Sequence, residues 1–166
     1  MKNRLFILFL VVGILVSALS ACENSSREAQ NRDDTDVEYK NEWTYIHKRV
    51  GPLTSPIWCA FIDTREVDLW HIYISPVKDV TIEEVVEFAP VRISLPVDFP
   101  LDDTVVRFSE DPYIAIEYLQ EVWSGHNAPQ GVVRAEYDAR NNDFRIYFKV
   151  PNRLTGSYEG SIEIVE

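Results

Sequence analysis

Apolar and polar side chains alternate with a period of two over much of the chain, which is the pattern of strands with one buried face. The clearest case is two segments joined by residues 139–142. Folding about this turn sets Tyr137 opposite Phe144 and, on the other face, Glu136 opposite Arg145 as a cross-strand ion pair. We therefore predict a hairpin here, whose remaining inward side chains are Val133, Ala135, Ile146, Phe148 and Val150.

A second hairpin is predicted from residues 57–63 and 68–75. A two-residue turn at Arg65-Glu66 places the large apolar side chains on one face, whereas a register shifted by one residue scatters them over both faces. Burial of one face therefore selects the first register. That register pairs Phe61 with Trp70, Cys59 with Ile72 and Ile57 with Ile74.

One short helix is predicted over residues 82–89. Thr81 and Glu84 have the spacing of a capping box, in which each side chain bonds the other residue's backbone N–H. Pro90 then ends the segment, because proline cannot continue a helix that precedes it.

Further strands are predicted over residues 91–97 and after the turn at residues 154–156. Residues 113–123 are open to two interpretations, because their flanking proline and glycine suit a helix while their aromatic and β-branched content favours a strand. We favour the strand. Eight or nine short strands and one short helix in a single domain, residues 43–166, indicate an antiparallel β-sandwich or barrel.

The first 21 residues have the order of a secretory signal peptide. Two cations, Lys2 and Arg4, precede an uncharged apolar run at residues 5–16, and small residues follow. A helix that crosses a bilayer needs about 20 apolar residues, so this run is short for a permanent membrane span.

The tetrapeptide Leu19-Ser20-Ala21-Cys22 resembles the lipobox of bacterial lipoprotein signal peptides. The resemblance implies cleavage before Cys22 and attachment of a diacylglyceryl group to its thiol, so that fatty acyl chains anchor the protein in a membrane. The order of segments after residue 57 is similar to uncharacterised β-rich lipoproteins of Bacteroidota. That likeness rests on pattern and implies no activity.

Residues 22–42 are almost wholly polar and are predicted to be a disordered tether between the lipid and the domain. The whole chain has a formal charge of −11, which disfavours nucleic acid as a partner because phosphate binding requires Lys and Arg. If Cys22 carries lipid, Cys59 has no cysteine with which to form a disulfide.

Few residues suggest chemistry. The predicted register places Cys59 and His71 on opposite faces of their hairpin, which excludes a nucleophile and base pair there unless the turn has three residues. His47, His71 and His126 lack the spacing of metal ligands on one element, and no cofactor is predicted. The carboxylates Asp98, Asp102, Asp103, Glu110 and Asp111 are interpreted as a solvated acidic surface.

Trp58 and Tyr73 are expected to lie opposite each other, with His71 beside them. Such aromatic side chains belong to the core if a second layer covers them, and form a binding surface if they are exposed. Trp58, His71 and Tyr73 are therefore the candidate binding residues.

Three functions remain open at this point. The first is a non-enzymatic, lipid-anchored module of the bacterial cell envelope that binds an envelope protein, a glycan or a small ligand. The second is a lipocalin-like carrier of a small apolar ligand, which requires an empty interior. The third is a hydrolase whose carboxylates come together only in the fold. The sequence favours the first, at the outer membrane or cell surface.

Overall fold

Eleven strands and one short helix are formed by residues 37–166, the part of the chain that the computed structural model describes. The predictions for residues 1–36, including the signal peptide, the acylation of Cys22 and most of the tether, lie outside this part. Residues 38–166 form one compact unit. The elements are β1 (Glu42–His47), β2 (Gly51–Pro56), β3 (Cys59–Asp63), β4 (Leu69–Ser75), α2 (Ile82–Phe88), β5 (Val91–Pro96), β6 (Asp102–Arg107), β7 (Ala115–Tyr118), β8 (Glu121–Ser124), β9 (Val132–Asp138), β10 (Asp143–Val150) and β11 (Leu154–Val165).

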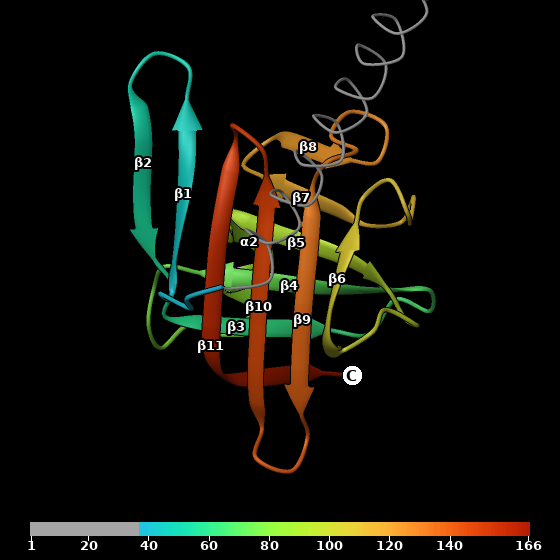
Figure 1. Ribbon diagram of the computed structural model, residues 1–166. Helices are drawn as coiled ribbons and strands as arrows, with labels where there is room; N and C mark the ends of the chain where they lie inside the picture. Colours follow the sequence, from blue (N-terminus) through green and yellow to red (C-terminus); the bar gives the residue numbers. More distant parts are fainter. Residues whose placement is uncertain (1–36) are drawn as a thin grey trace, which may run out of the picture. The chain divides into compact units, whose positions relative to one another are not determined.

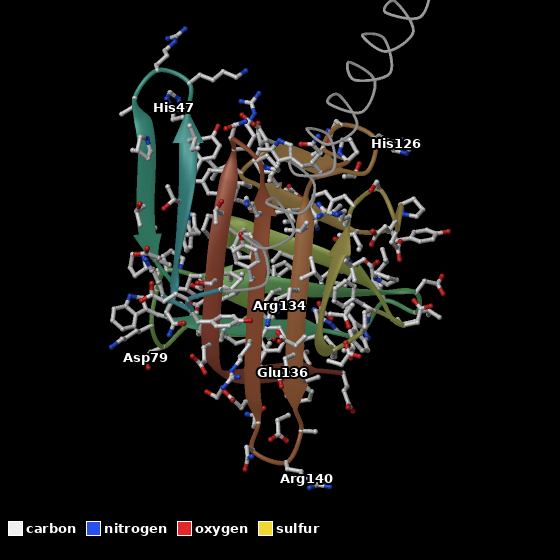
Figure 2. The ribbon with its side chains drawn as sticks, viewed as in Figure 1. His47, Asp79, His126, Arg134, Glu136 and Arg140 are labelled. Carbon is white, nitrogen blue, oxygen red and sulfur yellow. The ribbon has the colours of Figure 1, made fainter. Side chains whose placement is uncertain are left out.

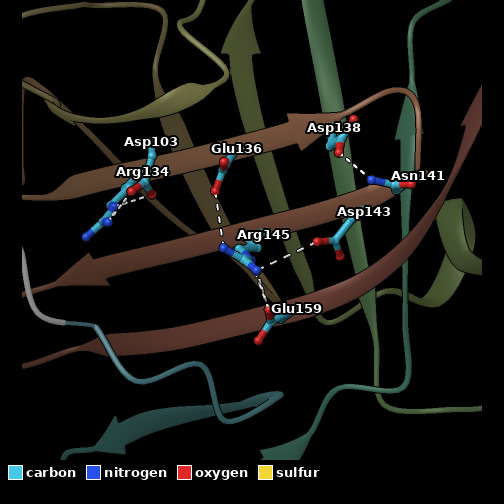
Figure 3. Close-up of polar contacts among 8 residues, drawn as sticks. All are labelled: Asp103, Arg134, Glu136, Asp138, Asn141, Asp143, Arg145 and Glu159. Carbon is cyan, nitrogen blue, oxygen red and sulfur yellow. Dashed lines mark hydrogen bonds and ion pairs between the residues drawn. The ribbon is translucent and has the colours of Figure 1, made fainter.

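The predicted hairpin around residues 139–142 is confirmed by strands β9 and β10. Tyr137 lies opposite Phe144 in the ladder. On the outer face a guanidinium nitrogen of Arg145 lies 3.5 Å from a carboxylate oxygen of Glu136, and the same side chain contacts two further carboxylates (Figure 3). Alternation with one buried face was therefore sufficient to predict both the register and the ion pair.

All strands belong to one curled, mixed sheet. Its order is β6-β9-β10-β11-β3-β4-β5-β7-β8, and β1 pairs with both β11 and β2. Strand β11 is twelve residues long; its first part pairs antiparallel with β10, and Ile162–Val165 pair in parallel with β3. Figure 1 shows β9, β10 and β11 crossing β3, β4 and β5 at a steep angle. Because one strand serves both halves, the sheet folds over its own core as a half-barrel.

The expected fold class, mostly β with one short helix, is confirmed. The strands number eleven in the described part rather than eight or nine, and one pair is parallel. The interior is filled by large side chains with no solvent exposure, among them Phe108, Phe144 and Phe148. Around these rings lie the fully buried aliphatic side chains Ile72, Ile74, Ile93, Leu95, Ile114, Ile116, Ile146 and Val91.

Helix α2 begins at the predicted capping box. The Glu84 backbone N–H donates to the Thr81 hydroxyl at 3.4 Å, and the Thr81 backbone N–H donates to the Glu84 carboxylate at 2.9 Å. The helix packs its apolar side chains on the outer face of the sheet, against Phe61 and Tyr73. The part of the sheet beneath α2 is therefore buried on both faces.

That double burial explains why the predicted register of the β3–β4 hairpin is wrong. Ile62 pairs with Ile72 and Phe61 with Tyr73, a shift of three residues from the prediction. An odd shift turns each side chain to the other face. Since α2 covers Phe61 and Tyr73 while the main core covers Ile62 and Ile72, apolar content on one face does not select a register here.

Residues 113–123 form strands, as favoured, but two of them. β7 and β8 are joined by a tight turn in which Leu119 adopts a left-handed conformation, with φ of +57°. The Leu119 N–H donates to the Pro90 carbonyl at 3.0 Å, so a contact with a distant segment holds this turn. The sequence lacks the glycine or asparagine that usually marks such a conformation.

The end of the predicted tether contacts the domain. The Lys40 backbone N–H donates to the Ser157 hydroxyl at 2.9 Å, and the Asn41 side-chain amide donates to the Glu159 carbonyl at 3.0 Å. Ordered contacts with β11 thus begin before β1 does.

Candidate binding site

The three candidate binding residues do not form one surface. His71 and Tyr73 lie on the outer face of β4, only 8% and 6% exposed, with ring centres 6.3 Å apart. Trp58 precedes β3 and is 51% exposed, and the Lys78 ammonium lies 3.9 Å from its ring centre. The expected pairing of Trp58 with Tyr73 is wrong, because Tyr73 pairs with Phe61.

His71 is held between two side chains. Its Nδ1 lies 3.0 Å from the Ser94 hydroxyl and its Nε2 lies 3.1 Å from the Glu66 carboxylate. Hydrolytic triads combine the same residue types, but there the serine meets Nε2 and nearby N–H groups stabilise an oxyanion. Ser94 lies inside β5, between His71 of β4 and Ala115 of β7. Because the sheet ladders use the backbone around Ser94, we interpret this chain of contacts as structural.

Cys59 lies on the same outer face as His71, so the prediction that the sheet separates them is wrong. Cys59 pairs with Ser75, which is four residues from His71 along β4. Its thiol donates to the Val77 carbonyl at 3.4 Å, and burial is the main cause that raises the pKa of this thiol. A protonated, engaged thiol far from the imidazole has no base to activate it.

The other two histidines lie far apart. His47 Nδ1 accepts from the backbone N–H groups of Arg49 and Val50, at 3.2 and 3.3 Å, and closes the tip of the β1–β2 hairpin. His126 lies in the loop after β8 (Figure 2). Within residues 37–166, no three His, Cys, Asp or Glu side chains are grouped closely enough to hold a metal ion.

Three of the five carboxylates named above meet in a groove of about 540 Å³, which we call the acidic groove. The other two, Asp102 and Asp103, lie in β6, where Asp102 accepts from the Thr104 N–H at 3.2 Å and Asp103 pairs with Arg134 (Figure 3). The lining of the acidic groove is Asp68, Pro96, Val97, Asp98, Glu110, Asp111, Pro112 and Tyr113.

A second cavity of about 540 Å³, the Trp123 pocket, lies between the loop after β8 and the turn between β10 and β11. It is the best candidate binding site, because it combines one aromatic side chain, apolar proline surface, several amides and one cation. Pockets that hold small ligands have this size and this mixture of apolar surface with a few polar groups. Its lining is Trp123, Asn127, Ala128, Pro129, Gln130, Val150, Pro151, Asn152 and Arg153.

Short-range hydrogen bonds shape both walls of the Trp123 pocket. The Asn127 side chain accepts from the Ser124 N–H and donates to the Val122 carbonyl, both at 2.8 Å, which folds the loop back on β8. On the other wall the Arg153 N–H donates to the Val150 carbonyl at 3.0 Å. Trp123, 7% exposed, packs into the main core and supplies the rigid base.

The electrostatics of the Trp123 pocket differ from those of the acidic groove. Its nine lining residues include one cation, Arg153, and no carboxylate, whereas four of the eight residues that line the groove are acidic. Nearby, the Tyr45 hydroxyl donates to Glu121 at 3.1 Å; burial is the main cause that raises the pKa of Tyr45, and this bond adds to it. The lining of the pocket thus contains no acid, although the protein is acidic and Glu121 lies nearby.

None of the pocket residues was among the candidates drawn from the sequence. The only local signal was the loop of residues 124–131, rich in glycine, proline and amides, which is typical of exposed functional loops. The sequence around Arg153 does not indicate a binding residue, because the residues across the pocket from it are more than 20 positions away in the chain.

Comparisons with known proteins add no assignment. No protein-family model matches the chain, and neither a curated protein nor a solved structure shows a significant similarity to it. Among the described residues, 37–166, no helix has the length and apolar content needed to cross a bilayer.

Proposed function

We propose that the chain is a non-enzymatic, lipid-anchored binding module of the bacterial cell envelope, which captures a small, hydroxyl-rich ligand such as a glycan segment. The observation that carries the proposal is the Trp123 pocket, a surface cavity of about 540 Å³ with an aromatic base and exposed amides at Gln130 and Asn152. Aromatic and proline surface suits the apolar face of a sugar ring, and amides suit its hydroxyl groups.

The filled interior favours a ligand bound at the surface over a ligand carried inside the domain. Phe108, Phe144 and Phe148 have no solvent exposure and occupy the centre of the core. A small barrel filled by its own side chains leaves no volume for an apolar cargo.

Hydrogen bonds made by two carboxylates of the acidic groove favour a binding module over a hydrolase. Glu110 accepts from the Arg107 N–H at 3.1 Å, and Asp111 accepts from the Tyr113 N–H at 2.8 Å. These bonds give Glu110 and Asp111 a role in holding their own turns, which favours a structural role for these two carboxylates over that of glycosidase acid and base.

The membrane anchor of the proposal is supported by the lipobox-like tetrapeptide that ends at Cys22. Cys22→Ala in the full chain is expected to move the protein from the membrane fraction to the soluble fraction, because the acyl chains supply the membrane affinity. Metabolic labelling with an alkynyl fatty acid is expected to mark the wild-type chain alone. Retention of the variant in membranes contradicts the anchor.

The ligand is tested by ligand-observed NMR with fragments of envelope glycans. Signals from bound fragments are expected with the wild-type chain and are expected to be lost when Gln130→Ala and Asn152→Ala are combined. Gln120→Ala changes another exposed amide, in the β7–β8 turn, and is the matched control. Binding that survives the double substitution contradicts the assignment of the site.

A further inference from the structure

We infer that the Trp123 pocket selects an anionic sugar, a ring that carries a carboxylate or phosphate, and that the guanidinium of Arg153 pairs with this acidic group. The inference rests on the proposed function and narrows its ligand class. It starts from the contrast between two cavities of equal volume, one lined by four acids without a cation and the other by one cation without an acid.

The charge of the whole domain makes this contrast significant. Residues 37–166 contain 12 Lys and Arg and 22 Asp and Glu, a formal charge of −10. A cavity placed at random on such a surface is expected to contain carboxylates, as the acidic groove does. A pocket without them avoids the repulsion that would otherwise exclude an anion.

The tip half of the neighbouring β1–β2 hairpin also lacks acids of its own; Glu42 lies at the other end of β1, and Tyr45 of β1 donates to Glu121 of β8. Residues 43–62 contain no Asp or Glu, and Lys48 and Arg49 are exposed at the hairpin tip. The Ile46 N–H donates to the Arg153 carbonyl at 2.7 Å, so this hairpin adjoins the pocket. Figure 2 shows His47 at the same projecting tip and Arg140 at the opposite end of the molecule. Two exposed cations on the tip of this adjoining hairpin would steer an anion towards this end of the domain.

Arg153 is available for such a ligand. Its backbone is fixed on both sides by the bonds to Val150 and Ile46. Within residues 37–166 no ion pair or hydrogen bond engages its guanidinium, whose positive charge partly offsets the burial that raises the pKa of Tyr45. By contrast, the guanidinium groups of Arg65, Arg92 and Arg145 all contact carboxylates. A planar guanidinium forms paired hydrogen bonds with a carboxylate or a phosphate, which adds direction to the attraction.

The test compares two anionic sugars with a neutral one, all with the ring configuration of galactose. The full chain, in detergent micelles, is titrated by calorimetry with a galacturonic acid disaccharide, with galactose 6-phosphate and with the neutral galactose disaccharide. At least one anionic sugar is expected to bind about tenfold or more tightly than the neutral one, since a hydrogen bond to a charged group contributes that much. The preference is expected to shrink as salt is added.

Variants then locate the effect. Arg153→Gln is expected to abolish the preference for the anionic sugar, and Arg153→Lys is expected to restore part of it. Arg140→Gln removes an exposed cation at the far end and is expected to change nothing, which separates the pocket from the overall charge.

Other outcomes overturn the inference. Equal binding of the neutral and anionic sugars contradicts it while leaving the proposed function intact. An unchanged preference in Arg153→Gln contradicts the role of that residue. Binding of none of the three sugars also overturns it. The NMR experiment with fragments of envelope glycans then tests the proposed function separately.

Discussion

Arg65 binds the carboxylate of Asp63 through two side-chain hydrogen bonds, from Nε to Oδ1 at 2.8 Å and from Nη2 to Oδ2 at 2.6 Å. The Arg65 backbone N–H donates to the same carboxylate at 3.1 Å. The side-chain bonds from Arg65 are the largest cause that lowers the pKa of Asp63 below its ordinary value. Asp63 therefore stabilises the fold above its unfolded pKa of about 3.9, and this contribution is lost as the pH falls through the lower, folded pKa.

Asp63→Asn is accordingly expected to lower the free energy of unfolding at neutral pH. The difference from wild type is expected to shrink as the pH falls from about 3.9, where the unfolded chain takes up a proton, and to end below the lower folded pKa, where Asp63 is uncharged in both states. Urea denaturation over a pH series measures it. Asp98→Asn, at an exposed position, is the control and is expected to have a small effect. A difference that stays constant into strong acid contradicts the mechanism.

Two buried tyrosine hydroxyls give opposite predictions. The Tyr39 hydroxyl has no hydrogen-bond partner in the described part of the chain, whereas the Tyr158 hydroxyl donates to the Ser161 carbonyl at 2.7 Å. Tyr39→Phe is expected to be neutral or stabilising, and Tyr158→Phe to cost about 1 kcal/mol. Chemical denaturation of both variants compares them directly. Equal losses of unfolding free energy in the two variants contradict a hydrogen bond at Tyr158 that Tyr39 lacks.

Gly156 lies under the ring of Phe148, so closely that an added Cβ would overlap the ring atoms. Gly156→Ala is expected to cost about 1–3 kcal/mol, because a fully buried ring has no room to move. Combining it with Phe148→Leu is expected to cost less than the sum of the single variants, since the smaller side chain relieves the overlap. A double-mutant cycle of unfolding free energies checks this, and simple additivity argues against the overlap.

The capping box of α2 can be tested by comparing the stabilities of variants at Thr81 and Glu84. Thr81→Ala is expected to lower stability by about 1 kcal/mol, because it leaves a helix N–H without its acceptor. Glu84→Ala is expected to lose the reciprocal bond, whereas Glu84→Gln retains an acceptor oxygen. Thermal unfolding should place the glutamine variant near wild type and the alanine variant below it. If both Glu84 variants lose stability equally, charge rather than capping is the cause.

The features predicted correctly from the sequence depend on residues that lie close together along the chain. Thr81 and Glu84 are three residues apart and need only a helical turn to form their two bonds. Tyr137 and Phe144 are joined by a short turn, and their strands bury one face, so a single register satisfies the pattern. The β-rich class follows from the same alternation along most segments.

The β3–β4 register was decided by tertiary packing. Because α2 covers the outer face while the core covers the inner one, Phe61 and Ile62 are both buried although they point in opposite directions. The pattern therefore contains no polar face to exclude the other register. The left-handed Leu119 is decided in the same way, by its bond to the carbonyl of Pro90.

By itself the sequence determined the class of fold, the capping box, one hairpin with its ion pair, and the expectation of an acylated Cys22. Only the tertiary structure decided where Trp123 and Arg153 lie relative to each other, because they come from separate segments that meet through the curl of the sheet. Alternation along a strand reports which side of that strand is buried. It does not report which distant loop closes over it, since that depends on how the whole sheet bends at β11.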